Sequence, residues 1–183
     1  MLVVVTGPIA SGKSSLARAV ACEFGRRGQK AAAVDLDLIY EMLDPGRAPK
    51  TDVARWAQAR RISARLATAL LAEGVAVVVE GGFLTPAERT DFTVALPPGV
   101  EARFVTLSIS FEVALERATN DETRGLSRDP AFLRDHYAAT AQALHDVPPV
   151  DLVVDTGATA IGEAACAVAD WALAEIARTI VQI

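Results

Sequence analysis

The sequence predicts an α/β fold, in which a parallel β-sheet is covered by helices on both faces. Short apolar runs alternate with longer stretches of helical periodicity, and this alternation is typical of repeated strand–helix units. The 183 residues are enough for one such domain with a sizeable core. Because no repeat, low-complexity segment or interdomain linker interrupts the pattern, we expect a single domain over residues 1–183.

Five apolar runs are the expected strands. Strands of a parallel sheet are buried on both faces, so their sequences are nearly continuous apolar runs. Ligands bind beyond the carboxyl ends of such strands, and four of the five runs end in polar residues or glycines suited to a site. The expected strands are Leu2–Thr6, Lys30–Asp35, Val75–Glu80, Ala102–Ser108 and Asp151–Asp155.

Helices are expected between these strands, and local signals mark several of their ends. A first helix over residues 14–27 ends with two arginines followed by Gly28. A long helix covers roughly residues 52–73. Thr85 and Asp129 each begin a further helix as N-caps, and each is followed by a proline in the first turn.

Composition excludes several classes of protein. The net charge of −5 argues against a general nucleic-acid binder, and the apolar stretches are too short to cross a membrane. Cys22 and Cys166 lack metal-ligand spacing, so we interpret them as small core residues. His136 and His145 lack a nucleophile or metal partner at a recognisable spacing, and we interpret them as surface or lid residues. These features are expected of a cytoplasmic protein.

The residues GPIASGKS, from Gly7 to Ser14, connect the first strand to the first helix. They match G-x-x-x-x-G-K-[ST], the phosphate-binding loop, whose backbone amides form a concave anion site at a helix N-terminus. Its lysine reaches the outer phosphates and its serine ligates Mg²⁺. The alternative, a glycine-rich turn with a chance lysine, is disfavoured because the match lies between a strand and a helix. We expect ATP and Mg²⁺ as cofactors, held through Gly7, Ala10, Ser11, Gly12, Lys13, Ser14 and Ser15.

Three carboxylates follow the second and third strands. Asp35 and Asp37 stand two residues apart, where they could hold Mg²⁺ through water or take a proton from a substrate hydroxyl. Asp37 could instead be a plain N-cap. Glu80 ends the third strand, where a phosphate-loop protein needs an acidic residue for the water shell of the metal. We predict a metal site of Ser14, Asp35 and Glu80, with Asp37 and Lys13 as catalytic residues.

The acceptor side of the site is expected after the third strand and at the start of the long helix. Gly81 and Gly82 would let a ligand approach the backbone. Phe83 either walls the substrate pocket or belongs to the core. Arg55 either meets a substrate anion or is a surface residue. These four and Asp37 are the expected substrate-binding residues.

Arginines cluster after the fourth strand, at Arg117, Arg124 and Arg128, with Gly125 as a hinge. Arginine stabilises the charge that spreads over a moving phosphoryl group, and a helical flap with several arginines is typical of a closing lid. The alternative is a solvated amphipathic helix. We expect a lid over about residues 111–146, with Arg117 and Arg124 on the nucleotide and Arg128 in catalysis.

These residues resemble the small P-loop kinases that are built like nucleoside monophosphate kinases. GPIASGKS resembles their phosphate loop, and DLD, at Asp35–Asp37, resembles the Asp-x-Asp of shikimate kinases, whose second aspartate contacts the accepting hydroxyl. DLIYEM is similar to the segment of chloramphenicol phosphotransferase that begins with its proposed catalytic aspartate. Both resemblances imply that Asp37 has this role.

Two further segments resemble parts of these kinases. LERATNDETRG is similar to their arginine-bearing lid, which implies that Arg117 packs against adenine. DLVVDTGAT, which contains Thr156, resembles their last strand and the loop on the base side of the nucleotide. The resemblance implies a three-layer fold with a five-stranded parallel sheet in the order 2-3-1-4-5. EGGF departs from the triple-glycine turn of shikimate kinases, so the resemblance does not identify the phosphate acceptor.

These features predict a kinase that transfers the γ-phosphate of Mg·ATP to a hydroxyl of a small molecule, either a metabolite or an antibiotic. A nucleotide, nucleoside or toxin-like sugar-nucleotide kinase is one alternative. A regulatory ATPase or nucleotide-binding module is the other, although the chain has no Asn-Lys-x-Asp sequence to read guanine. The expected partner is a small hydroxyl compound, and no nucleic acid or membrane.

Overall fold

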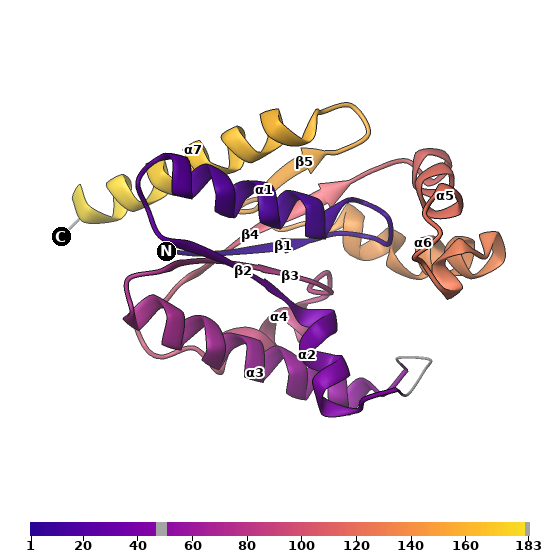
Figure 1. The fold of residues 1–183 in the computed structure, drawn as a ribbon, viewed down its shortest axis with the longest axis horizontal. Helices are drawn as coiled ribbons and strands as arrows, with labels where there is room; N and C mark the ends of the chain where they lie inside the picture. The colour runs from indigo at the N-terminus through magenta and orange to yellow at the C-terminus, as the bar shows by residue number, and fades with distance from the viewer. Residues whose placement is uncertain (47–50, 182–183) are drawn as a thin grey trace.

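The computed structural model describes residues 1–46 and 51–181, with side chains as far as residue 174. Its centre is a five-stranded parallel sheet in the order β2-β3-β1-β4-β5 (Figure 1). This confirms the predicted α/β class and strand order. The strands are β1 (Leu2–Thr6), β2 (Ala31–Asp35), β3 (Ala76–Glu80), β4 (Ala102–Ser108) and β5 (Leu152–Asp155).

Helices cover both faces of the sheet and extend past its carboxyl edge (Figure 1). One face carries α1 (Lys13–Arg26) and α7 (Ile161–Val181). The other face carries α2 (Leu36–Leu43), α3 (Val53–Ala72) and α4 (Pro86–Thr93). Beyond the carboxyl ends lie α5 (Phe111–Asn120), the short helix η1 (Leu126–Arg128) and α6 (Pro130–His145). None of the helices in the described residues is both long and apolar enough to cross a bilayer.

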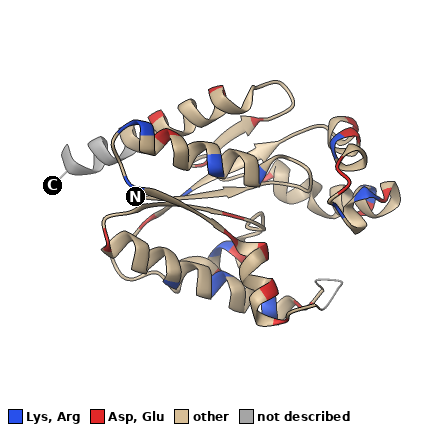
Figure 2. Ribbon diagram, in the orientation of Figure 1, with Lys and Arg blue, Asp and Glu red and all other residues tan. Residues whose placement is uncertain are grey.

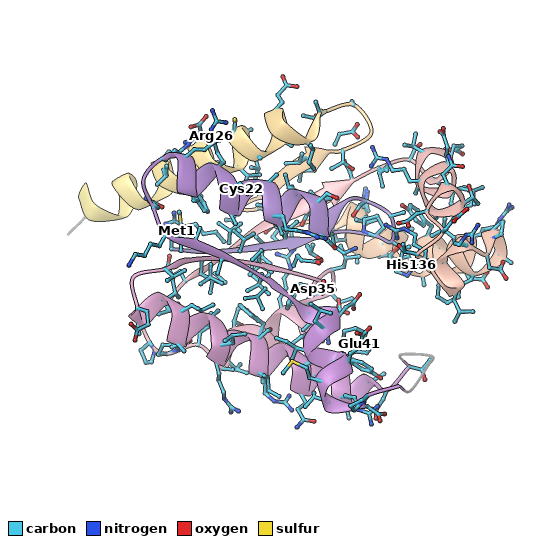
Figure 3. The ribbon with its side chains drawn as sticks, viewed as in Figure 1. Met1, Cys22, Arg26, Asp35, Glu41 and His136 are labelled. Carbon is cyan, nitrogen blue, oxygen red and sulfur yellow. The ribbon has the colours of Figure 1, made fainter. Side chains whose placement is uncertain are left out.

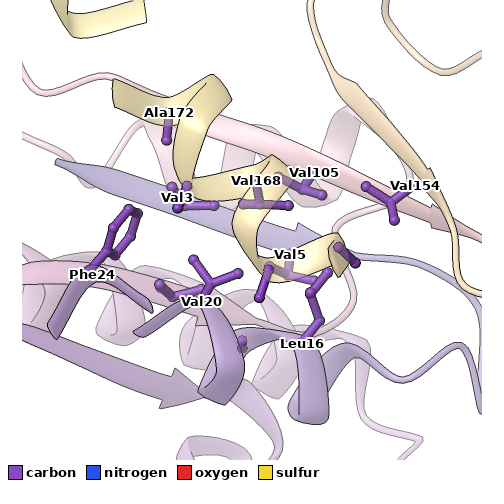
Figure 4. Packing of buried hydrophobic residues seen from close by; sticks show 14 of the residues in the cluster. Val3, Val5, Leu16, Val20, Phe24, Val105, Val154, Val168 and Ala172 are labelled. Atoms are coloured by element: carbon purple, nitrogen blue, oxygen red, sulfur yellow. The ribbon is translucent and has the colours of Figure 1, made fainter. Parts of the chain in front are cut away.

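The central strand β1 is buried along its whole length and supplies two separate cores. Val3 and Val5 pack with residues of α1 and α7 in the first core (Figure 4). Leu2 and Val4 pack with residues of α2, α3 and α4 in the second. Full burial of each such side chain stabilises the fold by about 1.5–3 kcal/mol. The loop that follows β1 therefore starts from a strand held on both faces.

Charged residues lie mostly on the helices and loops around these cores (Figure 2). Asp35 and Glu80 are exceptions, since they end β2 and β3 and are partners in the strand register. Their placement brings two of the predicted carboxylates to one point of the carboxyl edge. Three strands, β2, β3 and β5, begin one residue later than predicted.

The prediction that Cys22 is a core residue is wrong, because its side chain is exposed on α1. The buried stripe of that helix runs through Leu16, Val20 and Phe24 at four-residue spacing. Cys22 lies on the other side of the helix from this stripe. Cys166, on α7, is half-buried.

Candidate active site

The phosphate loop joins β1 to α1 in a conformation that requires glycine. Gly7 has a φ of 153°, and a Cβ there would lie 2.8 Å from both Leu107 Cβ and Ser11 Oγ. Ala10 has a φ of 62°, in the left-handed region that residues with a Cβ rarely adopt. Gly12 follows with a φ of 87° and is the N-cap residue that precedes α1. These backbone angles explain the glycine spacing of the motif.

The N-terminus of α1 is open, unlike those of α2 to α6. In each of α2 to α6, a side chain accepts a hydrogen bond from the first turn; these N-caps are Asp35, Asp52, Thr85, Ser110 and Asp129. α1 begins after Gly12, which offers no such acceptor, and apart from its chain neighbours no atom of the described residues lies within 4 Å of where a Cβ of Gly12 would be. Uncapped N–H groups and the helix dipole attract an anion, so this end of α1 fits a phosphate group.

The Lys13 side chain is folded over the loop. Its Nζ donates to the carbonyl oxygens of Gly7, at 3.1 Å, and Pro8, at 2.9 Å. Burial lowers the pKa of Lys13, and the nearby carboxylates of Glu80 and Asp37 oppose this. A phosphate in the loop would bring further negative charge to this ammonium and stabilise it.

Ser11, Thr156 and Arg117 form a chain of contacts on the other side of the loop. Thr156 Oγ1 donates to the carbonyl oxygen of Ser11 at 2.8 Å, and Arg117 Nη2 donates to the carbonyl oxygen of Thr156 at 2.7 Å. The Ser11 hydroxyl is buried and has no hydrogen-bond partner among the described residues. An unsatisfied buried hydroxyl is costly, so this loop is suited to a ligand rich in oxygen atoms.

Glu80 is the buried carboxylate of the site. Its side chain accepts a hydrogen bond from Ser14, and the residue is only 5% exposed. Burial raises the pKa of Glu80 to about 7; the Ser14 bond opposes this rise and the charge of Asp35 adds to it. These three residues, with Arg18 and Leu38, line a cavity of about 200 Å³. A larger hollow of about 400 Å³ lies at the start of β4, away from the phosphate loop.

The same residues fit a Mg²⁺ ion that a nucleotide helps to hold. Mg²⁺ usually takes one or two carboxylates together with phosphate oxygens and water. A carboxylate that is costly to ionise when alone favours a neighbouring cation. Ser14 and Glu80 would hold the ion, with Asp35 beside them. Within the described residues, no three His, Cys, Asp or Glu side chains are grouped so that they could hold a metal by themselves.

The first turn of α2 separates Asp35 from Asp37. Asp35 Oδ1 accepts the backbone N–H of Asp37 at 2.8 Å, so Asp35 is the N-cap of α2. The alternative that Asp37 is the cap is therefore wrong. Asp37 is exposed in the first turn, close enough to Lys13 for its charge to raise the pKa of that lysine. Asp35 thus has a structural role as the cap of α2, whereas Asp37 is an exposed residue of the first turn.

The turn after β3 is mostly part of the core. A Cβ on Gly81 would lie 2.6 Å from Leu36 Cβ, so Gly81 is required for the contact between this turn and α2. Phe83 is fully buried against Phe92 and Phe104, with ring centroids 5.3 and 6.5 Å away. Its interpretation as a wall of the substrate pocket is wrong, because its ring fills the space between strands and α4. Gly82, which is exposed, remains at the edge.

Arg55 is paired within the chain. Its guanidinium donates to Asp44, lies 3.5 Å from a carboxylate oxygen of Asp52, and stands 5.5 Å from the ring centroid of Tyr40. These contacts tie the end of α2 to the start of α3. In this arrangement Arg55 joins two helices rather than offering a free cation to a substrate.

Arg60 is a buried arginine that the sequence did not distinguish from surface residues. It is 6% exposed and donates to the carbonyl oxygen of Gly82 at 2.9 Å. It also donates to Glu88 at 2.7 Å and to Asp91 at 3.3 Å. Both carboxylates come from α4, more than 25 residues away, so no local pattern could have paired them. Arg60 holds the exposed turn at Gly82 in place.

The α5–η1–α6 segment carries the remaining predicted arginines. Arg124 Nε donates to Asp121 at 2.9 Å. The positive charge of Arg124 lowers the pKa of Lys13. Arg128 is exposed and donates to the carbonyl oxygen of Thr119 at 3.4 Å. The structure therefore brings Arg124 toward the phosphate loop, while Arg128 supports a turn within the segment.

Helix α6 reaches the phosphate loop through two residues that sequence reasoning missed. His136 is half-buried on α6 (Figure 3), and its Nε2 accepts the N–H of Ile9 at 3.2 Å. The Tyr137 hydroxyl donates to the carbonyl oxygen of Ile9 at 3.0 Å. The partner is a backbone group that lies 127 residues earlier in the chain, so no spacing in the sequence could have indicated it.

A parallel sheet in this order, with an open phosphate loop after its central strand, defines a protein of the P-loop kinase fold. The chain belongs to the AAA domain family, whose model matches residues 2–147. No curated protein matches the chain.

Several solved structures share the fold over almost the whole chain. An unliganded sugar kinase from Janibacter sp. HTCC2649 is 24% identical over 92% of both chains, with a TM-score of 0.65. A gluconokinase from Sinorhizobium meliloti 1021 is 23% identical over 98% of this chain and 95% of its own, with a TM-score of 0.63. The shikimate kinase from Acinetobacter baumannii, in complex with shikimate, is 19% identical over 94% and 93%, with a TM-score of 0.65.

Proposed function

We propose that this protein is a kinase that transfers the γ-phosphoryl group of Mg·ATP to a hydroxyl of a small molecule. The observation that carries the proposal is the position of Asp37. It is an exposed carboxylate at the carboxyl edge of the sheet, where the phosphate loop lies, and it does not cap its helix. Its negative charge raises the pKa of Lys13. A protein that only bound or hydrolysed ATP would need no such group at the acceptor side.

The phosphate loop is proposed to hold the nucleotide. The uncapped N–H groups of α1 bind the phosphates, and Lys13 moves from the loop carbonyls to the outer phosphate oxygens. Arg117 and Thr156 form the side of the loop on which the base lies. The support for this proposal is that these groups converge on one loop although they come from separate segments.

Ser14 and Glu80, with Asp35, are proposed to hold Mg²⁺ together with the nucleotide. Mg²⁺ held by these residues would supply positive charge against the negative charge that develops on the phosphates during transfer. Glu80 contributes a carboxylate that is already positioned by the Ser14 hydrogen bond. Asp35 keeps its place at the end of β2 because it also caps α2.

Asp37 is proposed to orient the acceptor and take its proton. As the acceptor oxygen bonds to the γ-phosphorus, the bond from that phosphorus to the β–γ bridging oxygen breaks and ADP leaves. The hydroxyl proton passes to the Asp37 carboxylate, a transfer worth roughly a hundred- to ten-thousand-fold in rate. Arg124 is near enough to Lys13 for its charge to lower the pKa of that lysine, and it is the arginine we assign to stabilise the moving phosphoryl group.

The proposed acceptor is a metabolite or an antibiotic with a free hydroxyl. The similar structures include proteins described as a sugar kinase, a gluconokinase and a shikimate kinase, and this favours a small compound with several hydroxyls. The exposed turn at Gly82 and the first turn of α2 leave the acceptor side open to solvent.

The proposal is tested by measuring ADP production with Mg·ATP against a panel of sugars, other hydroxyl metabolites, antibiotics and nucleotides. One class of hydroxyl compound should stimulate ADP release and gain a phosphate by mass spectrometry. ADP release without any acceptor would support a regulatory ATPase instead. Phosphate transfer to nucleotides would support a nucleotide kinase.

Asp37→Asn then tests the catalytic assignment. Transfer should fall at least about a hundredfold, while ATP affinity and melting temperature stay near those of the wild type, because Asp35 and not Asp37 is the cap. Glu163→Gln, an exposed carboxylate on α7, is the matched control and should transfer normally. Near-normal transfer by Asp37→Asn would remove Asp37 from the mechanism and point to Asp35 or Glu80.

A further inference from the structure

Helix α6 contacts the phosphate loop at both backbone groups of a single residue, Ile9. His136 Nε2 accepts its N–H at 3.2 Å, and the Tyr137 hydroxyl donates to its carbonyl oxygen at 3.0 Å. Consecutive residues of a helix point about 100° apart around its axis. Both can reach one residue only if the loop lies directly across the helix.

The two hydrogen bonds fix two successive peptide planes of the loop. The N–H of Ile9 belongs to the peptide that joins Pro8 to Ile9, and its carbonyl belongs to the peptide that joins Ile9 to Ala10. Each peptide is planar, so holding one edge orients the other. Tyr137 thereby orients the N–H of Ala10, and His136 orients the carbonyl of Pro8, to which Lys13 Nζ donates.

Apolar packing supports the same contact. Ala10 is 5% exposed and lies in a buried cluster with Ala114, Ala118 and Leu133 from α5 and α6. The Tyr137 ring packs against Phe111, with 5.6 Å between ring centroids, and Ile9 also packs against the cluster. The loop therefore places its own side chains in the core of the α5–α6 segment.

The contact is next to the most strained residue of the loop. Ala10 has a φ of 62°, and a residue with a Cβ in that region costs of order 1 kcal/mol. Such a conformation persists only where its surroundings hold it. The bonds to Ile9 and the burial of Ala10 are the surroundings that the structure supplies.

We propose that His136 and Tyr137 are positioning residues that hold the phosphate loop in its nucleotide-binding conformation, and that this support requires a neutral His136. As an acceptor from Ile9, Nε2 of His136 carries no proton, so the imidazole proton lies on Nδ1. Protonation of Nε2 would place a donor against the Ile9 N–H and break the bond. The inference rests on the nucleotide-binding part of the proposed function, but not on its acceptor.

The surroundings of His136 favour its neutral form on balance. Burial lowers the pKa of His136, Lys13 on α1 lowers it further, and Glu88 on α4 raises it. Tyr137, on the same helix, has a pKa raised to about 12 by burial and stays neutral. The pKa of His136 therefore lies below its ordinary 6.5, and the support is complete at neutral pH and lost in acid.

Calorimetry of ADP binding tests the proposal at pH 7.5 and at pH 5. His136→Leu should bind ADP about tenfold more weakly at pH 7.5, because it leaves the Ile9 N–H without an acceptor. His136→Gln keeps an acceptor oxygen that does not titrate, so it should bind nearly as the wild type at pH 7.5 and lose less affinity at pH 5. Tyr137→Phe should bind about threefold more weakly. The exposed His145, at the end of α6, gives the matched control His145→Leu, which should bind as the wild type.

A second measurement does not depend on nucleotide. The chain has two histidines, so ¹⁵N spectra of the imidazoles contain two sets of signals, and His145→Leu assigns them. His136 should be the tautomer protonated at Nδ1. A proton on Nε2 in the neutral form would overturn the hydrogen bond to Ile9.

The outcomes also separate this proposal from the proposed function. If His136→Leu binds ADP as tightly as the wild type, while Lys13→Ala has lost binding, the supporting role is wrong. If the wild type binds no ADP, both the positioning role and the kinase proposal are wrong. If ADP binding follows the predicted order but no acceptor is phosphorylated, the kinase proposal fails and the positioning role stands.

Discussion

The phosphate loop and the segment from Asp121 to Arg128 lie at the same edge of the sheet, but they are held in different ways. Gly81, beside the loop, is so closely packed that a Cβ would lie 2.6 Å from Leu36. Gly125, in the α5–α6 connection, would place a Cβ in open space. Arg124 and Asp121, which pair in that connection, have side chains that are 32% and 39% exposed.

The two regions differ in how far their polar side chains are exposed to solvent. Around the loop, Thr6, Ser11 and Glu80 are polar and buried, so each depends on a particular partner or ligand. In the connection, the ion pair is in contact with water, which can replace either partner at little cost. The proposed phosphate site, which would hold oxygen atoms in a fixed geometry, is thus built from buried residues, and the segment that is proposed to move is built from exposed ones.

The largest expected effect comes from Gly81→Ala. The new Cβ would collide with Leu36 and push α2 away from β3, so we expect a loss of about 2–3 kcal/mol in the free energy of unfolding. Gly25→Ala is the control, because Gly25 lies in α1 with open space around it and alanine favours helix by up to about 1 kcal/mol. Urea denaturation measures both. Equal stability of Gly81→Ala and the wild type would show that the turn is not closely packed.

Glu80→Gln should have an intermediate effect, and its sign depends on pH. The pKa of Glu80 in the folded protein, about 7, lies above its ordinary 4.5. The folded state therefore binds this proton more tightly than the unfolded state, and the wild type loses stability as pH rises from 4.5 through 7. The neutral glutamine avoids this loss, so the variant should be more stable than the wild type by about 1–2 kcal/mol at pH 8, in the absence of Mg²⁺.

The same variant should transfer phosphate poorly, because it lacks the proposed carboxylate for Mg²⁺. Urea denaturation at pH 5 and pH 8, with EDTA, measures the stability difference. A difference of the same size at both pH values would mean that Glu80 is not costly to ionise. Glu163→Gln, exposed on α7, is the control for the substitution itself.

The smallest effect is expected in the exposed connection. Asp121→Asn removes the partner of Arg124 and should leave the unfolding midpoint unchanged, because water replaces the ion pair. Hydrogen exchange over about residues 118–134 should nevertheless be faster in the variant. In the wild type, exchange there should slow when nucleotide and acceptor bind together, if the segment is a lid. Protection equal to that of the strands in the free protein would contradict a lid.

The phosphate loop was predictable from the sequence because the residues that form it follow one another in the chain. Gly7 to Ser14 supplies the turn, the amides and the lysine from eight successive residues, and the buried strand before it is a local pattern too. The sheet order followed from resemblance to a known fold, and the α/β class followed from the alternation of apolar runs and helical periods. Neither required knowledge of any contact between distant residues.

The roles of individual side chains were decided by tertiary structure. That Phe83 fills the core depends on how α4 packs against the sheet. Arg60 is buried only because two carboxylates of α4 reach it. The support of Ile9 by His136 joins residues 127 positions apart, and its partner is a backbone N–H that any residue type except proline would offer. Local sequence determines secondary-structure propensity and short motifs. The burial of a side chain and its pairing with a distant residue arise only when distant segments pack together.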